Sequence, residues 1–132
     1  MSDPLKFVVQ QHHMGGGVHW DLMLQRPEVN TDPQTSGLAT WQLLFPPVPI
    51  NLARPVIVKA LADHRLAYLS YAGPISRDRG WCCVFDEGHY RQFLYSKDVW
   101  LVEFAGKYLR GTFSLKKADE TDMWILAKSC PL

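Results

Sequence analysis

Short apolar runs, each ended by a cluster of turn-forming residues, recur along the whole chain. Runs of this kind, rich in valine, isoleucine, tryptophan and tyrosine, are typical of β-strands, whereas helices need longer stretches with a 3.6-residue period. The pattern predicts strands at Lys6–Gln11, His19–Gln25, Leu38–Phe45, Pro55–Ala60, Trp81–Phe85, Tyr90–Tyr95, Val99–Phe104, Leu109–Lys116 and Trp124–Lys128.

Turn signals separate these runs, and the clearest are Gly15-Gly16-Gly17, Asn30–Gly37, Pro46-Pro47, Arg77–Gly80, Glu87-Gly88, Ser96–Asp98 and Ala105–Lys107. The last of them predicts a hairpin with a three-residue loop. Because so many strands in 132 residues would leave exposed edges in an open sheet, a closed sheet is favoured. We therefore expect a mainly β fold, a compact antiparallel β-barrel of about eight strands with little helix. Without a linker or repeat, residues 1–132 are expected to form a single domain.

Composition limits the partners of the chain. It carries 14 Lys and Arg and 13 Asp and Glu residues, so its net charge is +1. This balance argues against a broad basic face for nucleic acid, although a local basic patch remains compatible with it. The three cysteines, two of them adjacent at Cys82 and Cys83, make a poor disulfide framework and suit a reducing compartment. With no signal-peptide pattern and no apolar stretch of membrane-spanning length, we expect a soluble, intracellular protein of the cytoplasm, nucleoid or nucleus, with no membrane partner.

One predicted strand carries a histidine and an aspartate on the same face. Because successive strand residues point to opposite faces, His19, Asp21 and Met23 share one side. The other side is apolar and is expected in the core, with Trp20, Leu22 and Leu24. An imidazole and a carboxylate side by side predict a metal site. The alternative is a hydrogen-bonded His–Asp pair at the rim of the barrel.

The end of the preceding strand adds further imidazoles. His12 or His13 can return across Gly15-Gly16-Gly17 to supply another nitrogen. Two or three histidines with one carboxylate form a borderline ligand set that suits Mn, Zn or Fe and suits Mg or Ca poorly. The glycine run has two interpretations of its own, a phosphate cradle built from backbone N–H groups or a flexible loop.

A second polar cluster lies at Asp63-His64-Arg65, with a tyrosine shortly after it. His64, Arg65 and Tyr68 can place an imidazole, a guanidinium and a phenol around one anion. The alternative is a polar turn that leads into an aromatic run of the core, and spacing alone favours that alternative.

Several blocks keep a distinctive order and spacing: Phe7–His12, His19–Leu24, Asp63–Tyr68, Gly73–Ser76, Arg79-Gly80, Leu109–Phe113 and Trp124–Leu126. Taken together, they resemble the 3′-phosphoesterase domain of DNA ligase D, and the likeness runs nearly from end to end. The resemblance implies a compact β-barrel that uses manganese or a similar divalent ion. Members of that family trim a 3′-terminal ribonucleotide and remove a 3′-phosphate, which leaves a 3′-hydroxyl for polymerase and ligase.

The same resemblance implies two groups of site residues: the metal ligands His12, His19 and Asp21, and the catalytic residues His64 and Tyr68. His13 is the alternate for His12, because counting back from His19 selects it. His12 is favoured, since an extra residue fits more easily in the glycine loop than in a strand, where it would turn side chains to the other face.

The chain departs from the family on the phosphate-binding side. Ligase-fused members carry an arginine two residues after the aspartate, where this chain has Met23, and a thioether cannot replace a bidentate guanidinium. Other arginines are then the candidates for phosphate binding, namely Arg65, Arg54, Arg79 and Arg77. The alternative for this group is that its members are solvated loop charges.

The resulting hypothesis is a Mn²⁺-dependent 3′-phosphoesterase or 3′-ribonuclease of DNA repair, with Zn²⁺ or another divalent transition metal as the alternative cofactor. Its expected partners are the 3′ ends of DNA, with or without a terminal ribonucleotide, and a repair ligase or polymerase in trans. Two alternatives stay open. One is a catalytically weakened nucleic-acid-end or metal-binding module of the same fold, and the other is a small His/Asp barrel oxygenase that depends on iron. The five tryptophans are expected mainly in the core, with base stacking as the alternative.

Overall fold

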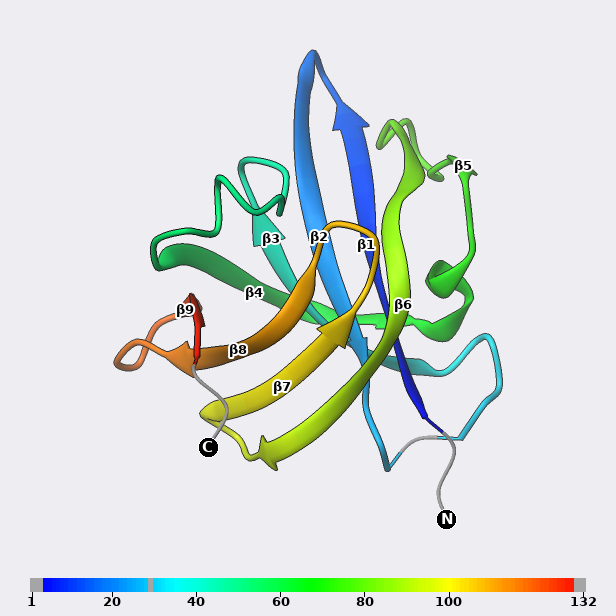
Figure 1. The fold of residues 1–132 in the computed structure, drawn as a ribbon. Coiled ribbons are helices and arrows are strands. Elements are labelled where there is room, and N and C mark those ends of the chain that lie inside the picture. The colour runs from blue at the N-terminus through cyan, green and yellow to red at the C-terminus, as the bar shows by residue number, and fades with distance from the viewer. Residues whose placement is uncertain (1–3, 29, 130–132) are drawn as a thin grey trace.

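The computed structural model describes residues 4–28 and 30–129. Within them, nine strands and one short 3₁₀ helix make up the regular structure (Figure 1). In chain order these elements are β1 (Leu5–Met14), β2 (Gly17–Gln25), β3 (Ser36–Leu43), β4 (Val56–Arg65), η1 (Leu66–Leu69), β5 (Gly73–Pro74), β6 (Trp81–Tyr95), β7 (Val99–Ala105), β8 (Arg110–Lys117) and β9 (Met123–Lys128).

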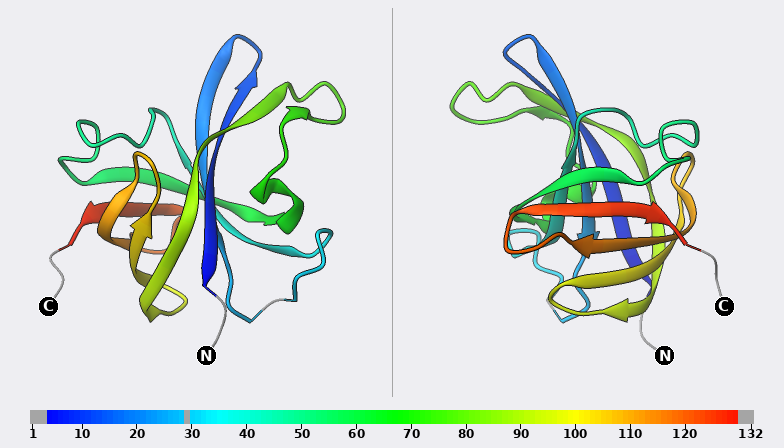
Figure 2. Two further views of the ribbon diagram at one scale, coloured as in Figure 1. Left: turned by 45° about the vertical axis from the view of Figure 1, so that its right-hand side comes forward. Right: turned by 90° about the vertical axis from the view of Figure 1, so that its left-hand side faces the viewer.

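The sheet closes on itself. Its strands follow the order β1-β2-β3-β4-β9-β8-β7-β6, and β6 pairs back onto β1, while β5 adds a short extra strand to β6. The β1–β2 hairpin extends well beyond the closed part of the sheet in every view (Figures 1 and 2). The predicted antiparallel barrel of about eight strands with little helix is therefore confirmed.

One predicted turn is wrong. The sequence predicts separate strands at Trp81–Phe85 and Tyr90–Tyr95 with a turn at Glu87-Gly88, but β6 runs unbroken through this region. It can do so because its first part pairs with β1 and its last part with β7. Gly88 is needed for close packing instead, since a Cβ there would stand 2.3 Å from the carbonyl oxygen of Ala105.

The predicted hairpin between β7 and β8 is present, but its loop is longer than expected. Ala105 pairs with Arg110, so the loop consists of the four residues 106–109 rather than three. The buried carboxylate of Asp86 holds this loop by accepting hydrogen bonds from three successive backbone N–H groups, those of Lys107, Tyr108 and Leu109. The sequence of the loop itself does not predict this distant hydrogen-bond acceptor.

Residues 66–80 leave the barrel wall. They carry η1 and β5, and they lie outside β1 and β6 before the chain returns at Trp81 (Figures 1 and 2). The sequence predicts neither element, because both are too short to produce a periodic pattern. Gln10 of β1 ties the segment down, since its side-chain amide nitrogen donates to the carbonyl oxygens of Tyr68 and Tyr71, each at 2.8 Å.

Two apolar clusters lie on opposite sides of β1 and β2. The larger one fills the barrel and includes Val9, Leu22 and Leu24, with Trp20 packed against it, as the alternation predicts. The smaller one lies on the outer side and consists of Val8, Met23, Leu38 and Leu66. Both sides of these strands are thus covered over part of their length. In the part of the chain that the structure describes, no helix has the length and apolar character that a membrane crossing needs.

Candidate metal centre

The register of the β1–β2 hairpin assembles the centre. His12 pairs with His19, Gln10 with Asp21, and Val8 with Met23, so these side chains form rows on the outer face. The hairpin turns through Gly15 and Gly16, whose φ angles are 58° and 84°. Positive φ at both central residues is what a two-residue type I′ turn requires, and such a turn fixes the register of its strands. The glycine run therefore sets which histidine faces which.

Three side chains of these rows converge. The Nδ1 atom of His12 lies 3.0 Å from Nε2 of His19, which lies 3.4 Å from Oδ2 of Asp21. Ligand atoms of all three residues lie within 4.8 Å of one another, so the group can hold a metal ion. Nε2 of His12 lies 2.7 Å from the carbonyl oxygen of Arg79 and must donate to it. This bond leaves the lone pair of Nδ1 directed at the centre, in the way that a backbone carbonyl orients a metal-binding histidine by accepting from its other ring nitrogen.

Two buried oxygen atoms beside the histidines have no hydrogen-bond partner among the described residues. They are Oδ1 of Asp21, a residue only 4% exposed, and Oε1 of Gln10. A buried carboxylate oxygen without a partner is costly, and a bound cation removes that cost. The imidazole and carboxylate donors of the centre fit a divalent transition metal. The sequence pattern does not mark Gln10 as a site residue, although Gln10 precedes His12 by two residues and so shares its face.

The structure brings His12 rather than His13 to the centre. His13 points to the opposite face, where its ring stacks on Trp81 at a centroid distance of 3.9 Å and an interplanar angle of 6°. Its Nε2 accepts a hydrogen bond from the side-chain amide of Gln11 at 2.7 Å. The alternate ligand is thus occupied elsewhere, as the preference for an insertion in the glycine turn predicts.

The centre opens into a cleft of about 340 Å³ between the outer face of the barrel and residues 66–80. His64 and Tyr68 both line it, and their rings meet edge to face at 5.6 Å. Nδ1 of His64 lies 2.9 Å from the carbonyl oxygen of Ala62. Tyr68 also packs against the smaller apolar cluster, so it serves both the cleft and the core.

Asp63 lines the same cleft but is already paired. Its carboxylate accepts two hydrogen bonds from Arg26, at 2.6 and 3.1 Å, and Arg26 also donates to the hydroxyl of Tyr95. The hydrogen bond to Asp63 raises the pKa of the Arg26 guanidinium, so the pair stays charged. This ion pair closes the loop after β2 against β4 rather than contributing to the metal group.

The four candidate phosphate-binding arginines separate into two pairs. Arg65 and Arg79 line the cleft, whereas Arg54 and Arg77 are exposed and do not. The guanidinium of Arg65 lies over the ring of Tyr68 and donates to Gln34. That of Arg79 donates to the backbone and hydroxyl oxygens of Ser76. Both are therefore held at the rim of the cleft by neutral partners.

The apolar wall of the cleft contains Met23 and Cys82. Met23 is buried in the smaller cluster with Val8 and Leu38, so a thioether occupies the place where the resemblance expects a guanidinium. Burial raises the pKa of the Cys82 thiol, and the nearby Asp21 raises it further. The thiol therefore stays neutral. Cys82 and Cys83 are both free, and the third cysteine, Cys130, lies outside the described residues.

No family model matches the chain, and no curated protein matches it either. Fold and geometry thus define an antiparallel β-barrel with a candidate His₂Asp metal centre on the outer wall. The likeness to the 3′-phosphoesterase domain of DNA ligase D is an interpretation of the sequence blocks.

Proposed function

We propose that the protein is a divalent-metal-dependent phosphoesterase that removes a 3′-phosphate or a 3′-terminal ribonucleotide from nucleic acid. The observation that supports this function best is the His12, His19 and Asp21 group, whose His12 and Asp21 line the same cleft as His64, Tyr68 and two arginines. Metal ligands, a proton carrier and fixed cations in one cleft are the parts that hydrolysis of a phosphate ester requires.

Nδ1 of His12, Nε2 of His19 and the carboxylate of Asp21 would hold the metal. Their mixed nitrogen and oxygen donors suit Mn²⁺, with Zn²⁺ as the alternative. When bound, such an ion supplies Lewis-acid stabilisation of charge on the phosphoryl oxygens. Gln10, which also lines the cleft, holds η1 and the residues after it in place, and its own carbonyl oxygen is buried without a hydrogen-bond partner among the described residues.

The remaining side chains would transfer a proton to the leaving group and balance the charge on the phosphoryl group. With Nδ1 of His64 donating to Ala62, its Nε2 is free to carry a proton toward the leaving oxygen of the ester. The ring of Tyr68 packs edge to face with that imidazole. Arg65 and Arg79, which line the same cleft, would balance charge on the phosphoryl group. The product would carry a 3′-hydroxyl, the group that a repair polymerase or ligase acting in trans consumes.

A second candidate function is a binding module of the same fold that recognises a metal or a nucleic-acid end without turnover. The burial of Met23 favours it, because an apolar contact takes the place of a phosphate-binding guanidinium. The two candidates differ in a single observable, the release of phosphate or nucleotide from a bound end.

The direct test uses oligonucleotides that end in a 3′-phosphate or a 3′-ribonucleotide, assayed with Mn²⁺ and with a chelator. His19→Ala and Asp21→Asn are expected to lower turnover on the order of a hundredfold or more. His89→Ala is the matched control, since this exposed histidine lies on β6 opposite Lys6 and Ala105, outside the cleft. Unchanged turnover in His19→Ala and Asp21→Asn would contradict the proposal, and tight end binding without turnover in several metals would select the second candidate.

A further inference from the structure

A second cavity, of about 400 Å³, lies at the tip of the β1–β2 hairpin. One wall is the stacked pair of His13 and Trp81, and the opposite wall is the glycine turn with Val18. Trp81 is 47% exposed, whereas Trp100, in the barrel core, is only 2% exposed. The part of the Trp81 indole that is left open is accessible to a ligand.

Hydrogen bonds from neighbouring side chains hold the His13 ring of the stacked pair. The indole N–H of Trp20 donates to Oε1 of Gln11, and the amide nitrogen of Gln11 donates to Nε2 of His13. This chain of hydrogen bonds fixes the plane of the His13 ring on which Trp81 stacks. A platform already fixed before binding loses little entropy when a ligand arrives.

Gly80 fixes the same pair through the backbone. Its φ is 85°, and a Cβ there would stand 1.8 Å from the carbonyl oxygen of His13. The loop before β6 can therefore approach β1 only with glycine at this position. That approach sets Trp81 opposite His13 in the register and Arg79 beside His12.

The second cavity adjoins the cleft of the metal centre. Met14, which is 48% exposed, lines both of them. The loop before β6 forms their shared wall, because Arg79 lines the cleft while Asp78 and Trp81 line the second cavity. A flexible chain that ends in the cleft can therefore cross Met14 and reach the platform.

The chemistry of the second cavity favours a nucleobase. Its walls are an aromatic stack, two exposed apolar side chains and glycine backbone, with Asp78 as the only charged residue among those that line it. Such walls suit a planar, uncharged heterocycle rather than a phosphate. The near-neutral chain has few cations with which to grip a nucleic-acid backbone, so stacking would supply affinity that charge does not.

We propose that the His13–Trp81 platform stacks an unpaired base of the strand whose 3′ terminus occupies the metal cleft. The substrate class is then a single-stranded or frayed 3′ end, and a blunt duplex is a poor ligand. This inference rests on the proposed function, since it takes the strand end to lie in the cleft. Stacking on one aromatic face is tolerant of sequence, so all four bases are accepted.

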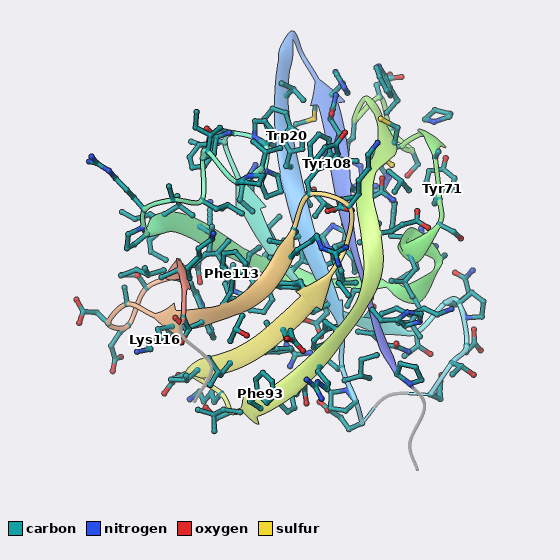
Figure 3. The ribbon with its side chains drawn as sticks, viewed as in Figure 1. Trp20, Tyr71, Phe93, Tyr108, Phe113 and Lys116 are labelled. Atoms are coloured by element: carbon teal, nitrogen blue, oxygen red, sulfur yellow. The ribbon has the colours of Figure 1, made fainter. Side chains whose placement is uncertain are left out.

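The test measures binding of a fluorescein-labelled single-stranded DNA with a 3′-hydroxyl, a product that is not turned over, by anisotropy in Mn²⁺. Trp81→Ala is expected to weaken binding about 5- to 150-fold, the effect of losing one base–aromatic stack. Trp81→Phe keeps an aromatic face and retains most of the affinity. Phe93→Ala is the control, because Phe93 is also exposed but lies at the other end of β6 (Figure 3).

Two further probes separate stacking from a general loss of affinity. The same strand with abasic residues at its last two positions binds wild type and Trp81→Ala alike, and a blunt duplex binds both weakly. Equal binding of the complete strand to wild type and Trp81→Ala overturns the inference. So does failure of any single strand to bind the wild type, which would leave the platform to a protein partner. Base-dependent binding without hydrolysis of a 3′-phosphate keeps the platform and overturns the proposed function.

Discussion

The two faces of β1 and β2 are built by the same two strands and differ in what they carry. The inner face is apolar where it lies inside the barrel, which it fills with side chains such as Val9, Leu22 and Leu24. The outer face starts with Val8 and Met23 and then changes to polar groups within two residues along each strand. One face stabilises the fold, and the other holds buried polar atoms that the fold leaves without partners.

Because of this difference, adjacent residues of one strand serve different purposes: one stabilises the fold and the next belongs to the candidate site. Leu22 and Asp21 are neighbours in the chain, yet one contributes apolar burial while the other costs desolvation. A row of buried polar groups lowers stability, and such a row is expected where the groups serve a function. The buried apolar cluster inside the barrel stabilises the fold that carries this polar row.

The largest expected loss of stability comes from a substitution on the inner face. Leu22→Ala is expected to lower the free energy of unfolding by about 2–5 kcal/mol, because it opens a cavity in the barrel core. Asp21→Asn, one residue away on the outer face, is expected to stay within about 1 kcal/mol of wild type without metal, since it removes a poorly compensated charge. Urea denaturation measures both values. Equal losses in the two variants would mean that the faces do not differ as described.

A second comparison, with an expected difference of about 1–3 kcal/mol between two variants, tests how the outer face is held near the hairpin turn. Gly80 and Gly16 have nearly the same φ, 85° and 84°, but a Cβ at Gly80 meets backbone while one at Gly16 meets open space. Gly16→Ala is expected to cost about 1–2 kcal/mol for its positive φ alone. Gly80→Ala is expected to cost about 1–3 kcal/mol more, because β1 and the loop before β6 must move apart.

The same pair of variants reports on the site. Thermal unfolding gives the stability difference, and amide exchange at Arg79 and Trp81 shows whether the loop has separated. If Gly80→Ala proves no costlier than Gly16→Ala, the close approach of this loop to His13 is not what orders the end of β1.

The smallest effect concerns pH and Tyr90, a core residue of β6 that contacts the end of β2. Burial raises the pKa of the Tyr90 phenol above its ordinary value of 10.0, and its hydroxyl donates to the carbonyl oxygen of Gln25. A raised pKa stabilises the fold below pH 10, and this contribution is lost as pH rises through the raised value. Tyr90→Phe is expected to cost about 1 kcal/mol at neutral pH. That cost should shrink above pH 10, and denaturation at pH 7 and pH 10.5 checks it. A constant difference would contradict the assignment.

The sequence predicted the barrel well because strand patterns and turn residues are local signals. It failed at Glu87-Gly88, where a turn-like pair lies inside β6, since only the tertiary approach of Ala105 explains the glycine. The face shared by His19 and Asp21 follows from alternation alone. The choice of His12 over His13 follows from the register of the hairpin. The glycine turn suggests that register, but the sequence alone does not show which glycines form the turn.

Other parts of the candidate site depend on contacts between distant segments. The carbonyl oxygen of Arg79 orients His12 across the sheet, and no local pattern announces such a bond. The platform partner of His13 is likewise a tryptophan that alternation alone would place in the core. Pairings of this kind come from closure of the barrel and from the path of residues 66–80, which short sequence windows do not contain.

The central claim is that His12, His19 and Asp21 bind a divalent metal, and the most direct test is thermal unfolding at increasing Mn²⁺. A ligand that binds only the folded state stabilises it by about 2.7 kcal/mol at 100 times its dissociation constant. Wild type and His89→Ala should therefore melt at rising temperatures as Mn²⁺ increases, while Asp21→Asn and His12→Ala should show no rise. A rise in Asp21→Asn and His12→Ala equal to that of wild type would contradict the claim.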